Sequence, residues 1–139
     1  MNGTDSIWWI VIISVVITLI LAFTRPDLIN PKPTYTNGHE YERYVAWWLG
    51  QNGYSNVKVT QKSGDYGADV ICKDKAGRLV AVQCKMYKGS VGYKAVQEVI
   101  AGMHYYKCDR AMVVTTGTFT KQAVTAARKC GVELKERIT

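Results

Sequence analysis

The chain has 139 residues, which is enough for one ordinary domain with a single core. With 47% hydrophobic and 21% charged residues, it is neither a disordered chain nor a disulfide-rich scaffold. Lys and Arg outnumber Asp and Glu by 18 to 11, and this basic balance favours association with polyanions, nucleic acid first and an anionic membrane leaflet second.

The first segment with a clear pattern is apolar and runs from Ile7 to Phe23 without a charged residue. As a helix it spans roughly 25 Å, just enough to cross a bilayer core. No Lys or Arg precedes it and no A-x-A-like site follows it, which favours a retained membrane anchor over residues 1–24 rather than a cleaved signal peptide. Arg25 and Lys32 flank only its far end, so the positive-inside rule predicts a single-pass protein with the catalytic domain in the cytoplasm.

The stretch RPDLINPKPTYTNG contains all three prolines of the chain, which favours an extended linker over residues 25–35. One domain is expected over residues 36–139. Its first helix is predicted from the capping pattern Asn37-x-x-Glu40 and from apolar residues at helical spacing, and it ends at Gly50 or Gly53.

Three predicted strands follow, NVKVTQ, ADVICKD and RLVAVQCKMY, and residues 74–77 form the turn between the last two. After a loop at residues 88–92, helical periodicity returns around Val96 and Val99. AMVVTT then reads as a buried strand, a last helix ends at Gly131, and GVEL adds a short final strand. The order α-β-β-β-α-β-α-β predicts an α/β fold with a central mixed sheet flanked by helices.

Asp69 opens the second strand, while Gln83 and Lys85 lie two residues apart on the third and therefore face the same side. The hairpin can bring all three together. Phosphodiester cleavage needs oxygen ligands for a hard cation and a positive group near the scissile phosphate, roles that Asp69 and Lys85 can fill. Gln83 offers only a neutral carbonyl, so Glu42 on the first helix is a candidate further ligand. A surface ion pair between Asp69 and Lys85 is the alternative from spacing alone.

These residues resemble the PD-(D/E)xK, or restriction-endonuclease-like, superfamily, and within it the Mrr-like restriction endonuclease domain. The resemblance rests on GHEYERYVAWWLGQNGYSNVKVT, SGDYGADVI, AVQCK and AMVVTTGTFTKQAVTAARKCGVEL, which together reach from Gly38 to Leu134. It implies a restriction-endonuclease-like core in which Asp69, Gln83, Lys85 and Glu42 are catalytic. Gln83 departs from the usual Glu or Asp but is typical of the Mrr-like branch.

The leading hypothesis is a Mg²⁺-dependent DNA endonuclease that restricts foreign or modified DNA, with Asp69, Gln83 and Glu42 as metal ligands. The alternatives are a catalytically silent, membrane-tethered DNA-binding module and a junction or repair nuclease. The expected partners are DNA, the membrane through residues 7–23, and a second copy of the chain, because double-strand cutting by one small site usually calls for a homodimer.

The remaining candidate residues are each interpreted first as structural or solvent-exposed residues. Lys88, Lys94, Lys121 and Arg128 are solvated charges that are predicted to contact the DNA backbone. Asp65 is expected in a turn, Glu40 as a cap, and His39 at the surface, while TTGTFT is expected to be a capping turn rather than a phosphate site. Trp47 and Trp48 are predicted to pack in the core rather than to stack on bases. The four cysteines, Cys72, Cys84, Cys108 and Cys130, are also predicted to be packing residues, and their spacing argues against zinc.

Overall fold

The computed structural model describes residues 3–24, 32–60 and 66–139, with side chains from Ile7 onward in the first of these ranges. The chain divides into two compact units, Met1–Lys32 and Pro33–Thr139, and each is described by itself. Asp65, which was predicted to lie in a turn, falls outside the described residues.

The first unit contains one helix, α1 (Gly3–Thr24). Its segment Ile7–Thr24 has a mean hydropathy of 2.7, and none of these side chains is buried by protein. The hydroxyls of Thr18 and Thr24 donate to the carbonyls of Ser14 and Ile20, each at 2.8 Å, so their polarity is satisfied within the helix. Judged by length and composition only, this helix is long and apolar enough to cross a membrane.

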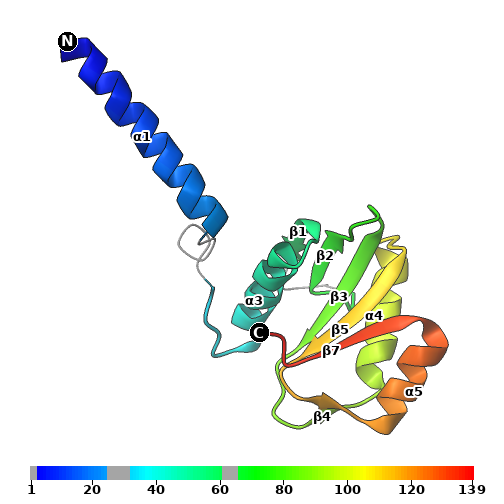
Figure 1. Ribbon diagram of the computed structural model, residues 1–139. Helices are drawn as coiled ribbons and strands as arrows, with labels where there is room; N and C mark the ends of the chain where they lie inside the picture. Colours follow the sequence, from blue (N-terminus) through cyan, green and yellow to red (C-terminus); the bar gives the residue numbers. More distant parts are fainter. Residues whose placement is uncertain (1–2, 25–31, 61–65) are drawn as a thin grey trace. The chain divides into compact units, whose positions relative to one another are not determined.

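The second unit is built on a five-stranded sheet with the order β1-β2-β3-β5-β7 (Figure 1). The strands are β1 (Ser55–Val59), β2 (Val70–Lys73), β3 (Leu79–Lys85), β5 (Arg110–Thr115) and β7 (Val132–Glu136), and the helices are α3 (Gly38–Gln51), α4 (Lys94–Tyr105) and α5 (Lys121–Cys130). β1, β2 and β3 pair antiparallel, whereas β3, β5 and β7 pair parallel. The predicted α/β class, element order and mixed sheet are confirmed.

Helices cover both faces of the sheet, and each face has its own core. α3 packs on one face, where its buried residues Tyr41, Tyr44, Val45 and Leu49 meet Val70, Val82 and Met112. α4 and α5 pack on the other, around Ala81, Val96, Val99, Val113 and Ala127. Because side chains alternate along a strand, Gln83 and Lys85 lie on the α4 side with Ala81, and Cys84 lies on the α3 side.

A second, two-stranded sheet was not predicted. It consists of β4 (Ser90–Val91) and β6 (Thr118–Phe119), which pair in parallel. The sequence predicted a loop at residues 88–92 and a capping turn in TTGTFT. The capping part is correct, since the Thr120 hydroxyl accepts from Ala123 N at 3.1 Å. The pairing of β4 with β6 was not predicted, because the two segments lie 28 residues apart and each is too short to show the alternation of a strand.

Local sequence signals explain the helix ends. Asn37 caps α3 by accepting from Glu40 N at 3.0 Å, as predicted, and the Glu40 carboxylate also accepts from the backbone N–H and the hydroxyl of Thr36. α5 ends at Gly131, whose φ of 69° is a left-handed conformation that glycine adopts without strain.

The predicted packing residues differ in their burial. Trp47 and Trp48 are half-buried against the core on the α3 side, which agrees with the prediction. All four cysteines are free thiols, of which Cys72 is buried and Cys84 and Cys108 are half-buried. Cys130 is exposed, so its prediction as a packing residue is wrong. By helical period Cys130 shares the face of the buried Ala123 and Ala127, but as the last residue of α5 it is left exposed.

Candidate active site

Asp69 sits immediately before β2 and is held by its own backbone between two other strands. Its N–H donates to Val82 O at 2.8 Å, and its carbonyl accepts from Thr60 N at 2.9 Å. The Thr60 hydroxyl adds a second bond to the same carbonyl at 3.1 Å. The Asp69 side chain is only 6% exposed. The backbone of Asp69 is therefore held between β3 and Thr60, and its side chain is buried rather than at the surface.

Glycines bring α4 against the segment that carries Asp69. A Cβ at Gly102 would lie 2.8 Å from Ala68 Cβ, and a Cβ at Gly67 would lie 2.1 Å from Glu98 O. Gly67 also has a φ of 91°, which other residues rarely adopt. This close approach places the middle of α4 beside the Asp69 segment.

Gln83 meets Asp69 across the β2–β3 hairpin. The Val70–Val82 pairing brings these two positions side by side, and Gln83 Nε2 donates to Asp69 Oδ2. The N–H of Cys84 donates to the same oxygen at 2.6 Å. Gln83 is buried, with 5% of its surface exposed. The two side chains that the sequence predicted to converge therefore do so.

Lys85 extends from the end of β3 to a partner that the sequence did not indicate. Its Nζ lies 2.6 Å from Glu98 Oε2 on α4, and both side chains are about a third exposed, at 32% and 31%. Glu98 lies one helical turn before Gly102. The only signal in the sequence was that Glu98 lies four residues before Gly102, on the same face of the helix. The helical periodicity does not show which segment packs against that face.

Glu42 approaches the end of β3 from the α3 side of the sheet. Its carboxylate pairs with His39 Nδ1 at 2.9 Å, a contact that the sequence did not predict. Burial raises the pKa of the Cys84 thiol well above its usual range, and the charges of Asp69 and Glu42 add to this effect. Glu42 thus pairs with His39, and its charge acts on Cys84, which lies on the opposite face of β3 from Gln83 and Lys85.

Two adjoining hollows open at this end of β3. One, of about 470 Å³, is lined by Lys85, Glu98 and Lys94, and the other, of about 520 Å³, is lined by Tyr35 and Lys88. Both also include Gly38, Met86 and Tyr87. Two of the four predicted DNA-contacting cations, Lys88 and Lys94, therefore flank the Lys85 end. The other two, Lys121 and Arg128, are exposed on α5.

Residues 35–139 match the family model described as "Restriction endonuclease", the Mrr catalytic domain. The chain belongs to this restriction endonuclease family. The match covers the whole sheet and the helices on both of its faces, so it includes every residue of the candidate site. The resemblance found in the motifs is therefore confirmed at the level of the family.

Solved structures with the same fold include other nucleases. The modification-dependent restriction endonuclease AspBHI is 20% identical over 70% of this chain, with a TM-score of 0.57. A repair endonuclease from Pyrococcus abyssi is 19% identical over 74%, with a TM-score of 0.53. EndoMS in complex with double-stranded DNA is 19% identical over 76%, with a TM-score of 0.52. This restriction-endonuclease-family chain spans 28%, 48% and 47% of those chains, respectively. A search of the curated proteins found no match.

The ligand atoms that Asp69 and Gln83 offer indicate which metal ion the site would bind. Within the described ranges, no three His, Cys, Asp or Glu side chains gather into a metal-binding group. A carboxylate and an amide carbonyl are nevertheless hard oxygen donors, and Mg²⁺ binds through one or two carboxylates while keeping several waters. Asp69 and Gln83 therefore fit an ion of this kind better than zinc.

Proposed function

We propose that the second unit is a Mg²⁺-dependent DNA endonuclease that hydrolyses phosphodiester bonds at the Lys85 end of β3. The observation that carries this proposal is the junction of Asp69 and Gln83 beside the Lys85–Glu98 pair. Membership of a restriction endonuclease family supports hydrolysis of DNA. The similar structures, which include a restriction endonuclease, a repair endonuclease and a complex with double-stranded DNA, support the same substrate class.

Asp69 and Gln83 are the residues that would hold the cation. The bonds from Gln83 Nε2 and Cys84 N fix the Asp69 carboxylate, and the Gln83 carbonyl supplies a second, neutral oxygen. When bound, the ion supplies Lewis-acid activation of the phosphate and of water. Glu42 is proposed as the further ligand, because its charge acts on Cys84, the neighbour of Gln83, and a single carboxylate is a weak anchor for a divalent cation.

Lys85 supplies the positive charge in this proposal. An ammonium group held in a partly buried position stabilises charge developing on phosphate, since it does not have to reorganise during the reaction. Glu98 holds that ammonium at 2.6 Å and so acts as a positioning residue. Lys88 and Lys94 extend the cationic surface on either side, where backbone phosphates of the same substrate would lie.

The first unit is proposed to be a membrane anchor. Its apolar stretch of 18 residues and its internally satisfied threonines support this role. We place the chain as a single-pass protein with the domain at residues 36–139 in the cytoplasm, joined through a linker at residues 25–35. A homodimer is proposed for double-strand cutting. The proposed action is restriction of foreign or modified DNA.

A silent DNA-binding module is the second candidate function. It is favoured by one observation, namely that an amide, Gln83, stands beside Asp69 where a second carboxylate would bind a cation more tightly. A silent module would show salt-sensitive DNA binding without cleavage under any metal. A junction or repair nuclease would instead prefer branched substrates.

The test is cleavage across a substrate panel by the full chain in detergent micelles. Supercoiled, methylated and branched DNA are incubated with Mg²⁺ or with EDTA. Cleavage is expected with Mg²⁺, its loss is expected in Asp69→Asn, and no change is expected in Asp109→Asn, a matched control on the exposed surface. Binding without cleavage would support the silent module, and cleavage that persists in Asp69→Asn would reject this site.

A further inference from the structure

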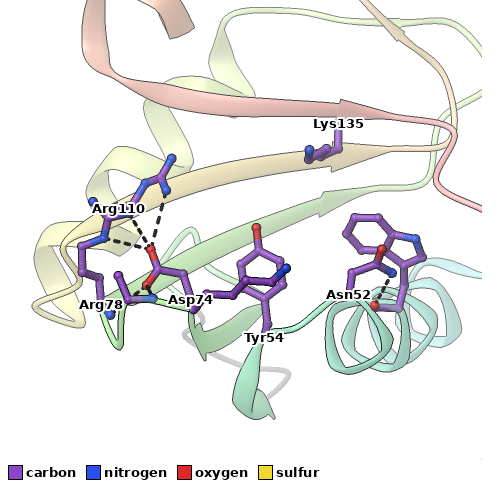
Figure 2. Close-up of a pocket in the computed structure, with 9 residues that line it drawn as sticks. Asn52, Tyr54, Asp74, Arg78, Arg110 and Lys135 are labelled. Atoms are coloured by element: carbon purple, nitrogen blue, oxygen red, sulfur yellow. Dashed lines mark hydrogen bonds and ion pairs between the residues drawn. The ribbon is translucent and has the colours of Figure 1, made fainter.

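A second hollow lies at the opposite end of β3 from Lys85. It has a volume of about 450 Å³ and combines cations with aromatic rings (Figure 2). Its cations are Lys75, Arg78, Arg110 and Lys135, its rings are Trp48 and Tyr54, and Asn52, Asp74 and Ala76 complete the lining. Arg78 precedes β3 and Lys85 ends it, so at ~3.3 Å per residue about 23 Å separate them along the strand. This hollow is therefore distinct from the candidate active site.

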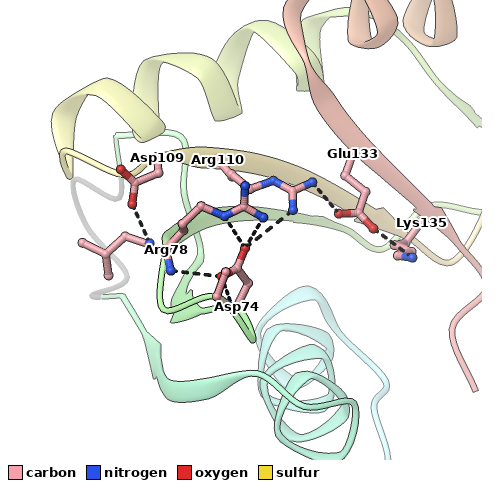
Figure 3. A network of polar contacts seen from close by, with 8 residues as sticks. Asp74, Arg78, Asp109, Arg110, Glu133 and Lys135 are labelled. Carbon is pink, nitrogen blue, oxygen red and sulfur yellow. Dashed lines mark hydrogen bonds and ion pairs between the residues drawn. The ribbon is translucent and has the colours of Figure 1, made fainter.

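Three cations of this hollow, Arg78, Arg110 and Lys135, are held by carboxylates in one polar network (Figure 3). Asp74 Oδ2 binds Arg78 through Nε and Nη2, each at 2.9 Å, and lies 3.6 Å from Arg110 Nη1. Glu133 binds Lys135 at 2.9 Å and lies 3.4 Å from Arg110 Nη2. Asp74 and Glu133 thus pair with these three cations, while a third carboxylate in Figure 3, Asp109, accepts from Leu79 N at 2.8 Å. With Lys75 added, four cations face three carboxylates. The hollow therefore attracts an anion.

Arg110 has the capacity to bind that anion. A guanidinium carries five N–H donors, and both ion pairs of Arg110 are longer than the 2.7–2.9 Å typical of a charge-assisted hydrogen bond. Its planar fork also matches two oxygens of a phosphate. Arg78 is held more tightly but lies beside Arg110, so the two guanidiniums present donors from the same wall (Figure 2).

Lys75 is brought to the hollow by a glycine. A Cβ at Gly53 would lie 2.4 Å from Lys75 Cε, and Gly53 has a φ of 85°. The absence of a side chain there lets the Lys75 stem cross the turn just before Tyr54. In Figure 2, Tyr54 stands between Asn52 on one side and the group of Asp74, Arg78 and Arg110 on the other, with Lys135 above it.

The aromatic side of the hollow is suited to a base. Trp48 is half-buried on α3, and its carbonyl accepts from Asn52 Nδ2 at 2.8 Å, which ties Asn52 to the same wall. Flat rings bind nucleobases by stacking, largely irrespective of base identity. Bases inside a duplex already stack on each other, so a nucleotide that stacks here must be free or part of a single strand.

We propose that this hollow binds a nucleotide, with its phosphate at Arg110, Lys75 and Lys135 and its base against Trp48 and Tyr54. The nucleotide is either a free mononucleotide or one unit of a single strand. Both sources share the same base-plus-phosphate chemistry, and binding requires none of the proposed catalytic residues. The site would therefore give this endonuclease-family domain a second nucleic-acid or effector contact.

A local fluorescence titration tests the proposal. The full chain, in detergent with EDTA, carries Trp8→Phe, Trp9→Phe and Trp47→Phe, which leaves Trp48 as the sole indole of the four in the sequence. The probes are dAMP, deoxyadenosine, inorganic phosphate and 5′-phosphorylated (dA)6. The test variant adds Lys75→Ala with Lys135→Ala, and the charge-matched control adds Lys58→Ala with Lys129→Ala. Thermal melts establish that all variants are folded.

Saturable quenching of Trp48 by dAMP or by (dA)6 is expected. Affinity should fall about tenfold in the Lys75/Lys135 variant and less than twofold in the control. Tighter binding of (dA)6 with a steep salt dependence would assign the site to a strand, and equal or tighter binding of dAMP would assign it to a free nucleotide. The proposal is overturned by the absence of saturable quenching, by equal losses in both variants, or by deoxyadenosine or phosphate alone binding as tightly as dAMP.

Discussion

The two ends of β3 are both cationic, but the aspartates at the two ends differ in their burial and in their binding partners. At one end Asp69 is 6% exposed, and its carboxylate accepts hydrogen bonds from the Gln83 amide and the Cys84 backbone N–H. The Lys85–Glu98 ion pair lies at the same end of the strand. At the other end Asp74 is bound by Arg78 and Arg110 at the rim of an open hollow. Positive charge alone therefore does not mark the proposed catalytic end. The distinguishing feature is a buried carboxylate, Asp69, near a lysine, Lys85, whose ion pair is with Glu98.

Replacing a lysine or an arginine at the two ends should separate them most strongly. Lys85→Ala is expected to lower the single-turnover rate of plasmid cleavage by ~10²–10³, the usual loss when one preorganised charge is removed from a reacting centre. Arg78→Ala, which also removes a cation from a β3 terminus, should change the rate less than about threefold, because it lies roughly 23 Å away. Similar losses in both would show that charge, and not position, governs cleavage.

The role of Glu98 sharpens the comparison, because Glu98 pairs with Lys85 at the proposed catalytic end. Glu98→Gln is expected to lower kcat by about ten- to a hundredfold with little change in KM, since Lys85 would lose the group that positions it. Glu98→Asp should recover part of the rate. In a Lys85→Ala background, Glu98→Gln should have no further effect, as double-mutant cycles require of a residue that acts through another. An additive loss would argue against positioning.

The close packing of α4 predicts a stability effect at Gly102. Gly102→Ala should destabilise the fold by ~1–3 kcal/mol, because the new methyl would lie 2.8 Å from Ala68 beside Asp69. Gly50→Ala is the control, since it lies in a helix with nothing within 4 Å and should be neutral or stabilising. Thermal unfolding of the full chain measures both. A Gly102→Ala variant that is as stable as Gly50→Ala would show that this contact does not hold α4 in place.

The smallest effect is expected from acid at the other end of β3. Partial burial alone would raise the pKa of Asp74, but hydrogen bonds from Arg78 and Ala76 and the Arg78 charge lower it below its ordinary 3.8. A depressed pKa contributes stability above the unfolded value, and this contribution is lost as pH falls through the folded value. Wild-type melting temperatures should therefore fall below about pH 4 slightly more steeply than those of Asp74→Asn. Identical slopes would mean that the ion network adds no measurable stability.

The sequence allowed prediction of those features that depend on local periodicity. Strand alternation and the turn at residues 74–77 were sufficient to place Asp69, Gln83 and Lys85 on one side of a hairpin, and the pairing Val70–Val82 agrees. The crossover through α4 was enough to predict the parallel half of the sheet. Each of these inferences needs only neighbours in sequence and a strand or helix period.

The remaining features depend on contacts between distant segments, which no period reveals. Glu98 reaches Lys85 because two glycines let α4 approach the Asp69 segment. Likewise, β4 and β6 are two residues long and meet only in the fold. The second hollow combines residues from five segments between Trp48 and Lys135, so its charge excess was visible only as net composition.

Cleavage of supercoiled plasmid by aspartate variants at the two ends of β3 tests the central claim most directly. Wild-type chain, Asp69→Asn and Asp74→Asn are compared in Mg²⁺ and in EDTA, with folding checked by thermal melts. The account predicts Mg²⁺-dependent cutting by the wild type and by Asp74→Asn, and none by Asp69→Asn. Cutting by folded Asp69→Asn at the wild-type rate, or equal loss in both variants, would contradict the assignment of the Asp69–Gln83–Lys85 end as the catalytic centre.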